Sequence, residues 1–125
     1  MGDVKKILAI DDNLMMLDLI EKMLSPNYEI HTVHSAANAL NFLNANSVDI
    51  ILLDIEMPNV SGFDFLYDIR KIPSYFQVPI IIVSGNSGED FFREAKKSSA
   101  FAVLTKPVTK DKMVDTIENA LAASR

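Results

Sequence analysis

The feature that most constrains the fold is a set of four short runs of apolar residues, at 7–10, 50–53, 80–83 and 101–104. Uninterrupted apolar runs of this length are typical of parallel strands that helices cover on both faces. A weaker run at 28–33 alternates with polar residues, which indicates a strand at the edge of a sheet. The sequence therefore predicts five strands.

Segments with the period of an amphipathic helix separate the predicted strands. In the first segment, Leu17, Ile20, Met23 and Leu24 form one apolar stripe. The stripes of the four later segments are Ala36, Leu40 and Leu43; Phe63, Leu66 and Ile69; Phe91, Phe92 and Ala95; and Met113, Val114, Ile117 and Leu121. Five strands that alternate with five helices predict an α/β protein with a doubly wound parallel sheet.

The composition narrows the classes of function. A net charge of −5 argues against a nucleic-acid surface, which needs clustered lysine and arginine. The absence of cysteine excludes disulfides and thiolate metal sites, and no apolar run approaches the roughly 20 residues of a membrane helix. We expect one cytoplasmic domain over residues 1–125, either a stand-alone protein or a piece of a longer one, with no nucleic-acid or membrane partner.

Polar residues stand where four of the predicted strands end. They are Asp11 and Asp12 after the first strand, Asp54 after the third, Ser84 and Gly85 after the fourth, and Thr105, Lys106 and Pro107 after the fifth. Doubly wound sheets bind ligands outside the carboxyl ends of their strands, where the strand order reverses. We therefore expect these side chains to meet at one site.

The residue types at this site indicate phosphoryl chemistry. Three carboxylates close together raise one another's pKa unless a cation offsets them, and ligands that are all oxygen suit Mg²⁺, with Mn²⁺ as a substitute. Lys106 adds a positive charge and Ser84 a hydroxyl donor. These groups are the parts that stabilise phosphoryl transfer, and a carboxylate can be the nucleophile. We expect Asp54 to be that nucleophile.

Four motifs in this order resemble the receiver domain of two-component response regulators, over essentially the whole chain. They are AIDDN (9–13), LLDIEMPNVSG (52–62), IIIVSG (80–85) and LTKPV (104–108). The resemblance implies a flavodoxin-like sheet in the order 2-1-3-4-5. We predict helices one and five on one face and helices two, three and four on the other, with the carboxylates of Asp12 and Asp54 within about 8 Å, a span that one ion can bridge.

The resemblance also implies a metal site. Asp12 and Asp54 would bind Mg²⁺ directly, Asp11 mainly through water, and Glu56 through its backbone carbonyl. We expect the side chain of Glu56 to be solvated and of less importance than its carbonyl.

The remaining roles that the resemblance implies concern phosphoryl transfer. Asp54 would accept the phosphoryl group from a phosphohistidine on a sensor histidine kinase or a histidine phosphotransfer protein. Ser84 would donate a hydrogen bond to the phosphoryl group, and Lys106 would pair with it, ahead of a cis bond to Pro107. Gly62 would suit the loop after the acceptor strand, where a side chain is costly. Phosphorylation would change the surface offered to a downstream protein or output domain.

Two positions depart from the pattern of the family. Val103 stands where an aromatic residue is usual, three residues before the lysine, and Ser99 stands where glycine is common. Val103 is short and stiff at χ1, so it cannot move a ring between two positions. We therefore predict that Phe101 keeps one rotamer, and that Phe91, Phe92, Phe101 and Val103 contribute to an apolar docking surface. A partner, or a second copy through the face of helix four, strand five and helix five, would bind there.

Three other functions compete with this interpretation. An aspartate-nucleophile phosphatase would need a second aspartate where this chain has Glu56, and a cap domain. A flavodoxin-like flavin carrier would need a phosphate-binding loop where the sequence reads DDNLMM. The third is an interaction module that is never phosphorylated. We expect no enzyme activity beyond the domain's own phosphorylation and dephosphorylation.

Overall fold

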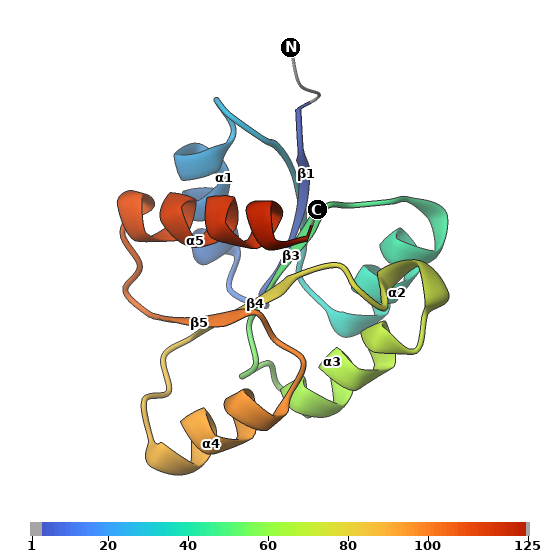
Figure 1. The fold of residues 1–125 in the computed structure, drawn as a ribbon, viewed down its shortest axis with the longest axis vertical. Coiled ribbons are helices and arrows are strands. Elements are labelled where there is room, and N and C mark those ends of the chain that lie inside the picture. The colour runs from blue at the N-terminus through green and yellow to red at the C-terminus, as the bar shows by residue number, and fades with distance from the viewer. Residues whose placement is uncertain (1–3, 125) are drawn as a thin grey trace.

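The computed structural model describes residues 4–124 and contains one five-stranded parallel sheet in the order β2-β1-β3-β4-β5 (Figure 1). The predicted fold class and strand order are therefore confirmed. The strands are β1 (Lys6–Ile10), β2 (Glu29–Val33), β3 (Ile50–Leu53), β4 (Ile80–Ser84) and β5 (Ala102–Thr105). The helices are α1 (Leu14–Leu24), α2 (Ala36–Ala45), α3 (Gly62–Arg70), α4 (Glu89–Lys97) and α5 (Lys110–Ala123), with a 3₁₀ turn η1 (Pro73–Tyr75) before β4.

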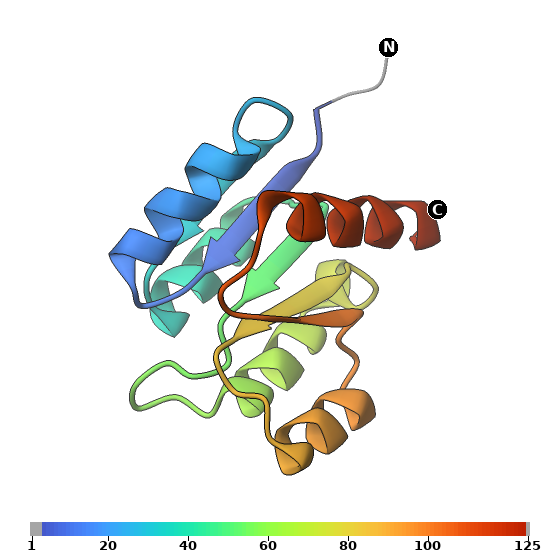
Figure 2. The same ribbon diagram turned by 90° about the vertical axis from the view of Figure 1, so that its left-hand side faces the viewer.

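Helices cover both faces of the sheet, with α1 and α5 on one face and α2, α3 and α4 on the other, as predicted (Figures 1 and 2). Neighbouring residues of the central strands point to opposite faces, because side chains of a strand alternate. In β3, Ile50 packs with α1 and α5, whereas Ile51 packs with α2, α3 and α4. Burial on both faces explains why the central strands are uninterrupted apolar runs.

The strand β2 lies at the edge of the sheet and pairs only with β1 among the described residues. Its residues are exposed or partly exposed. This arrangement confirms the prediction of an edge strand from its alternating sequence.

The turn η1, which the sequence patterns did not predict, contains the buried Tyr75 and is held by a half-buried arginine. Arg70, the last residue of α3, donates from Nη1 to the carbonyls of Tyr75 at 2.8 Å and Val78 at 2.5 Å. Its Nε donates to Ser99 Oγ at 2.7 Å. Ser99 therefore has a structural partner at the position where it departs from the family pattern, and Arg70 joins the segments before β4 and β5.

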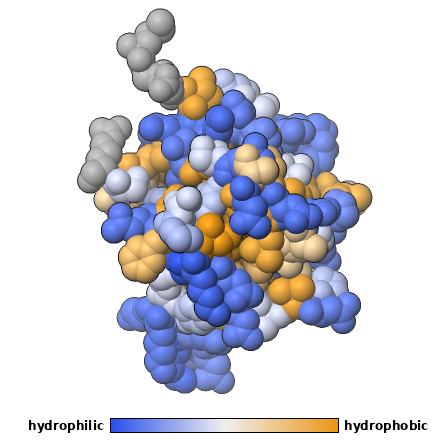
Figure 3. Space-filling model, turned by 90° about the vertical axis from the view of Figure 1, so that its right-hand side faces the viewer, coloured by the Kyte–Doolittle hydropathy of each residue, from blue (hydrophilic) through white to orange (hydrophobic). Residues whose placement is uncertain are grey.

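The surface in Figure 3 shows apolar residues in patches between hydrophilic ones. In the part of the chain that the structure describes, no helix has both the length and the apolar character needed to cross a membrane.

Candidate functional site

The pairing of the strands brings four loops to one end of the sheet. In β1 and β3, Ile10 is the partner of Leu53, and Asp54 N donates to Ile10 O at 2.9 Å, so the residues that follow these strands lie side by side. In β4 and β5, Ser84 is the partner of Thr105, and the N–H of the next residue donates to Ser84 O at 2.7 Å. The strand arrows in Figure 2 point to this common end.

Three carboxylates form a cluster at this end. Oxygen atoms of Asp11, Asp12 and Asp54 all lie within 4.8 Å of one another. Asp11 and Asp54 are buried, with 2% and 4% of their surface exposed, whereas Asp12 is exposed at the rim. The predicted proximity of Asp12 and Asp54 is confirmed.

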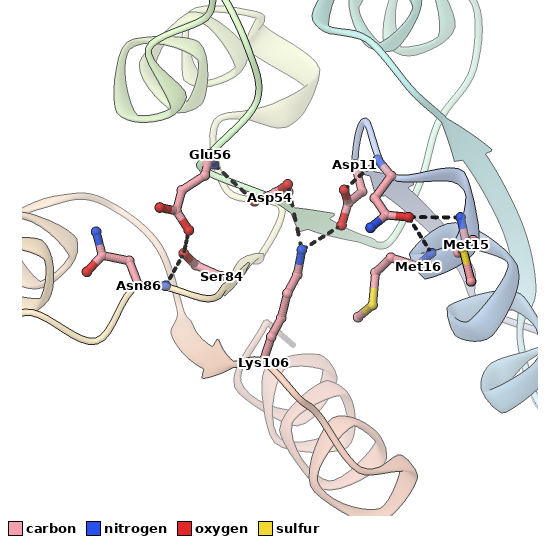
Figure 4. Close-up of polar contacts among 9 residues, drawn as sticks. Asp11, Met15, Met16, Asp54, Glu56, Ser84, Asn86 and Lys106 are labelled. Carbon is pink, nitrogen blue, oxygen red and sulfur yellow. Dashed lines mark hydrogen bonds and ion pairs between the residues drawn. The ribbon is translucent and has the colours of Figure 1, made fainter.

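Lys106 reaches this cluster from the end of β5 (Figure 4). Its Nζ donates to Asp11 Oδ2 at 3.0 Å and lies 3.7 Å from Asp54 Oδ2. Burial alone would lower the pKa of Lys106, but the hydrogen bond and the negative charge of Asp11, with the charges of the other two aspartates, raise it. The lysine therefore stays charged and offsets part of the negative charge of the cluster.

Burial raises the pKa of Asp54 to about 6, and the charge of Asp11 adds to this effect. The N–H of Glu56, which donates to Asp54 Oδ1 at 3.0 Å, and the charge of Lys106 act in the opposite direction. One lysine beside three carboxylates leaves an excess of negative charge. A cluster of this kind, with only oxygen atoms as ligands and one exposed member, can hold a hard divalent cation.

Ser84 is fully buried and takes part in a short chain of hydrogen bonds. Its hydroxyl donates to Glu56 Oε1 at 2.8 Å and accepts from Asn86 N at 3.1 Å. The side chain of Asn86 in turn accepts from Gly88 N at 2.9 Å, and Gly88 is the N-cap residue of α4. Figure 4 shows the side chain of Glu56 pointing to Ser84 and away from Asp54.

This contact corrects the expectation that the side chain of Glu56 is only solvated. Glu56 as a residue is exposed, but its carboxylate accepts a hydrogen bond from the buried hydroxyl of Ser84. Neither this contact nor the role of Asn86 is predictable from the sequence, because neither spacing nor residue type identifies a partner 28 residues away.

Gly62 begins α3 where the loop after β3 folds back on itself. A Cβ atom at this position would lie 2.6 Å from Ile55 Cα and closer still to its carbonyl oxygen. Glycine therefore permits a close backbone contact, as expected for this loop. The Lys106–Pro107 peptide bond is cis, as the resemblance implied.

The residues expected at a docking surface divide between the core and a groove. Phe92, Phe101 and Val103 line a groove between α4 and β5. Phe91 does not line it: the residue is only 7% exposed, and its ring packs against Phe63 of α3 with centroids 5.9 Å apart. The expectation that Phe91 contributes to an exposed surface is therefore wrong, because it lies on the inner side of α4.

The fold and the position of its acidic site define the class: a doubly wound α/β domain with its chemistry at the carboxyl ends of the central strands. The family model for the response regulator receiver domain matches residues 7–118, and the chain belongs to this family. The protein is thus a receiver domain of two-component signalling. Membership of this family does not favour the phosphatase, the flavin carrier or the unphosphorylated module.

Curated relatives are similar over most of this chain. The transcriptional regulatory protein GlrR of Escherichia coli K12 is 30% identical over 119 residues, which are 94% of this chain and 26% of the relative. The sensor histidine kinase RcsC of the same strain is 32% identical over 117 residues, 93% of this chain and 12% of the kinase. The chain therefore spans about a quarter or less of these relatives.

A solved structure supports the same assignment. The chemotaxis protein CheY4 of Vibrio cholerae superposes with a TM-score of 0.89 at 26% identity, and the match covers 95% of this chain and all of that one. The similarity therefore extends to a protein whose whole resolved chain is one such domain.

Proposed function

We propose that this domain accepts a phosphoryl group on Asp54 in a Mg²⁺-dependent reaction, and that the modification changes the surface it offers to partners. The observation that carries this proposal is the position of Asp54. Its carboxylate is buried at the tip of a central strand, within 4.8 Å of oxygen atoms of Asp11 and Asp12, and its Oδ2 is 3.7 Å from Lys106 Nζ.

The exposed Asp12 and the buried Asp11 and Asp54 have the oxygen ligands that suit a Mg²⁺ ion, and Mn²⁺ would suit the same ligands. In this proposal Asp12 and Asp54 bind the ion directly, Asp11 binds mainly through water, and Glu56 contributes its backbone carbonyl. Bound Mg²⁺ would neutralise charge on the oxygens of the phosphoryl group during transfer.

The residues of the chain then have separate tasks in the transfer. An oxygen of Asp54 attacks phosphorus, and the bond to the donor imidazole breaks with its electron pair returning to the ring nitrogen. The N–H of Glu56 orients the carboxylate of Asp54 before the attack. Lys106 and Ser84 then stabilise the transferred group through a positive charge and a hydroxyl donor.

The partners in this proposal follow from the relatives, which include a sensor histidine kinase and transcriptional regulatory proteins. The phosphoryl donor would be a phosphohistidine on a sensor kinase or on a histidine phosphotransfer protein. The phosphorylated domain would act on a downstream protein or an attached output domain, and a homodimer would form through the face of α4, β5 and α5. Beyond its own phosphorylation and dephosphorylation, we propose no enzymatic turnover.

Incubation with acetyl phosphate and Mg²⁺, followed by intact mass measurement, tests the proposal. We expect a single labile phosphoryl group on the wild type and none on Asp54→Asn, because an amide is a far poorer nucleophile than a carboxylate. Asp12→Asn should react slowly and recover part of its rate in excess Mg²⁺, since it removes a ligand to the ion.

The exposed Asp64→Asn, on the first turn of α3, is the matched control and should react like the wild type. Phosphorylation of Asp54→Asn at the wild-type rate would show that another residue is the acceptor. Steady hydrolysis of ordinary phosphomonoesters would instead favour a phosphatase.

A further inference from the structure

The hydroxyl of Ser84 can donate its hydrogen bond to only one acceptor at a time. A serine hydroxyl has one proton to donate and two lone pairs that accept. Here the proton goes to Glu56 Oε1 at 2.8 Å, and one lone pair accepts from Asn86 N at 3.1 Å. Ser84 is fully buried, so little water is available to replace either partner.

A phosphoryl group on Asp54 would need the same proton, because its oxygens only accept hydrogen bonds. The hydroxyl cannot donate to Glu56 and to the phosphoryl group at the same time. The competing acceptor belongs to the site itself, since the backbone N–H of Glu56 holds Asp54 Oδ1 at 3.0 Å. A carboxylate is a strong acceptor, because a charged partner shortens and strengthens a hydrogen bond.

We propose that the carboxylate of Glu56 is an intramolecular competitor for the Ser84 hydroxyl and so stabilises the unphosphorylated conformation of the domain. This inference rests on the proposed phosphorylation of Asp54. Phosphorylation then has to displace Glu56 before Ser84 can turn to the phosphoryl group. The strength of this one contact sets how readily the domain switches.

The contact has a direct route to α4. The hydroxyl that Glu56 holds also accepts from Asn86 N, and the side chain of Asn86 accepts from Gly88 N at the start of α4. When Ser84 turns away from Glu56, the loop between β4 and α4 loses the geometry of these two hydrogen bonds. Phe92, which lies on α4 and lines the groove beside β5, moves with the start of the helix.

Titration with beryllofluoride at saturating Mg²⁺ tests this inference, because this mimic occupies the place of the phosphoryl group without a chemical step. In calorimetry we expect Glu56→Ala to bind the mimic about 3- to 10-fold more tightly than the wild type, the range that one net hydrogen bond provides. The affinity of Glu56→Gln for the mimic should lie between those of the wild type and Glu56→Ala, since its amide oxygen still accepts a hydrogen bond but carries no charge.

Loss of negative charge near the site also favours the binding of an anionic mimic. Two controls separate this charge effect from the competition of Glu56 for the Ser84 hydroxyl. Glu89→Gln removes an acidic residue on the first turn of α4 that makes no hydrogen bond to Ser84, and should change the affinity less than 2-fold. In a Ser84→Ala background, Glu56→Ala should also change it less than 2-fold, because no hydroxyl is left to compete for.

An NMR experiment adds a readout that charge alone would not change. In the absence of the mimic, the amide signals of Asn86 and Gly88 in Glu56→Ala should shift toward their positions in the mimic-bound wild type. The inference would be overturned if Glu56→Ala raised the affinity for beryllofluoride equally in the wild-type and Ser84→Ala backgrounds. Amide signals of Asn86 and Gly88 that do not shift in Glu56→Ala would overturn it as well. Failure of the wild type to bind beryllofluoride would instead refute the proposed function.

Discussion

At the scale of single residues, the buried position of the Asp54 carboxylate lowers the stability of the folded domain when the carboxylate is ionised. A carboxylate that is buried beside Asp11 is harder to ionise, and its pKa rises from the ordinary value of 3.8 to about 6. A folded-state pKa above the unfolded value means that the folded state prefers the protonated form. This contribution to stability is therefore fully present below about pH 4 and is lost as the pH rises through about 6.

We predict that Asp54→Asn raises the free energy of unfolding at pH 7.5, without Mg²⁺, by about 1–2 kcal/mol. The rise in the pKa of Asp54 corresponds to a free energy of at most about 3 kcal/mol. Water at the open side of the site screens the charges and reduces this free energy. Urea unfolding at pH 7.5 and at pH 3.5 measures the effect, which should disappear at the lower pH. Mg²⁺ should also reduce it, because the ion stabilises the wild type.

The exposed Asp64→Asn is again the control, and its stability should follow the wild type at both pH values. An Asp54→Asn variant that is less stable than the wild type at pH 7.5 would show that Asp54 is not under electrostatic strain.

At the scale of elements, Arg70 fixes how α3 meets the segments before β4 and β5. Its guanidinium donates to the carbonyls of Tyr75, Val78 and Ser99, and to the Ser99 hydroxyl. A planar group with five donors can satisfy such a set, whereas the single ammonium of lysine cannot reproduce the same directions. The C-terminal end of α4 is thereby held near α3, while its N-terminal end depends on the hydrogen bonds of Asn86.

We predict that Arg70→Ala lowers the free energy of unfolding by about 2–4 kcal/mol, because hydrogen bonds from a charged donor are lost and carbonyl groups lose their partner. Arg70→Lys should recover less than half of this loss. Urea unfolding of both variants gives the measurement.

Arg93→Ala is the matched control, since among residues 4–124 the guanidinium of Arg93 forms a salt bridge with exposed Asp90 on the same helix and with no other carboxylate. Its effect should stay below about 0.5 kcal/mol. Equal losses for Arg70→Ala and Arg93→Ala would contradict the structural role of Arg70.

At the scale of the whole molecule, the site and the groove between α4 and β5 lie at different levels of the sheet. Phe101 N donates to Ile80 O at 2.7 Å, so Phe101 lies beside the beginning of β4, whereas Ser84 is its last residue. Four residues of strand separate the two positions by about 13 Å. Phe101 as a residue is 42% exposed and lines the groove with Phe92 and Val103.

We predict that Phe101 keeps the same rotamer with and without a phosphoryl mimic, because its ring is too far away to fill space that Ser84 leaves. Val103, which lies closer along β5, has no ring to move. Paired crystal structures with and without beryllofluoride measure both side chains, and Phe92 on α4 should show the larger displacement. A Phe101 ring that turns toward Ser84 on activation would show that this prediction is wrong.

Local patterns in the sequence are enough to predict the sheet, its helices and the polar residues at the strand ends. Continuous apolar runs are typical of strands in a helix-covered parallel sheet, and an alternating run is typical of an edge strand. These local patterns predicted the five strands to within one residue at each end. The strand order followed from the motifs. Asp11, Asp12, Asp54 and Lys106 could be assigned to one site because the ends of parallel strands share an edge.

Which of two neighbouring aromatic residues of α4 lies in the core depends on tertiary packing and not on the local sequence. Phe91 and Phe92 are equivalent in type and in sequence context, but a helix presents adjacent residues about 100° apart. Packing against Phe63 selects Phe91 for the core and leaves Phe92 at the groove.

The tertiary structure also decided which distant polar groups pair. Glu56 with Ser84, and Arg70 with Ser99, are 28 and 29 residues apart. No periodic pattern encodes these pairs, because each depends on where two loops arrive after the sheet and helices have packed. A hydrogen bond requires its two partners to lie within about 3 Å of each other. The packing of the whole folded chain sets the positions of these side chains to that precision.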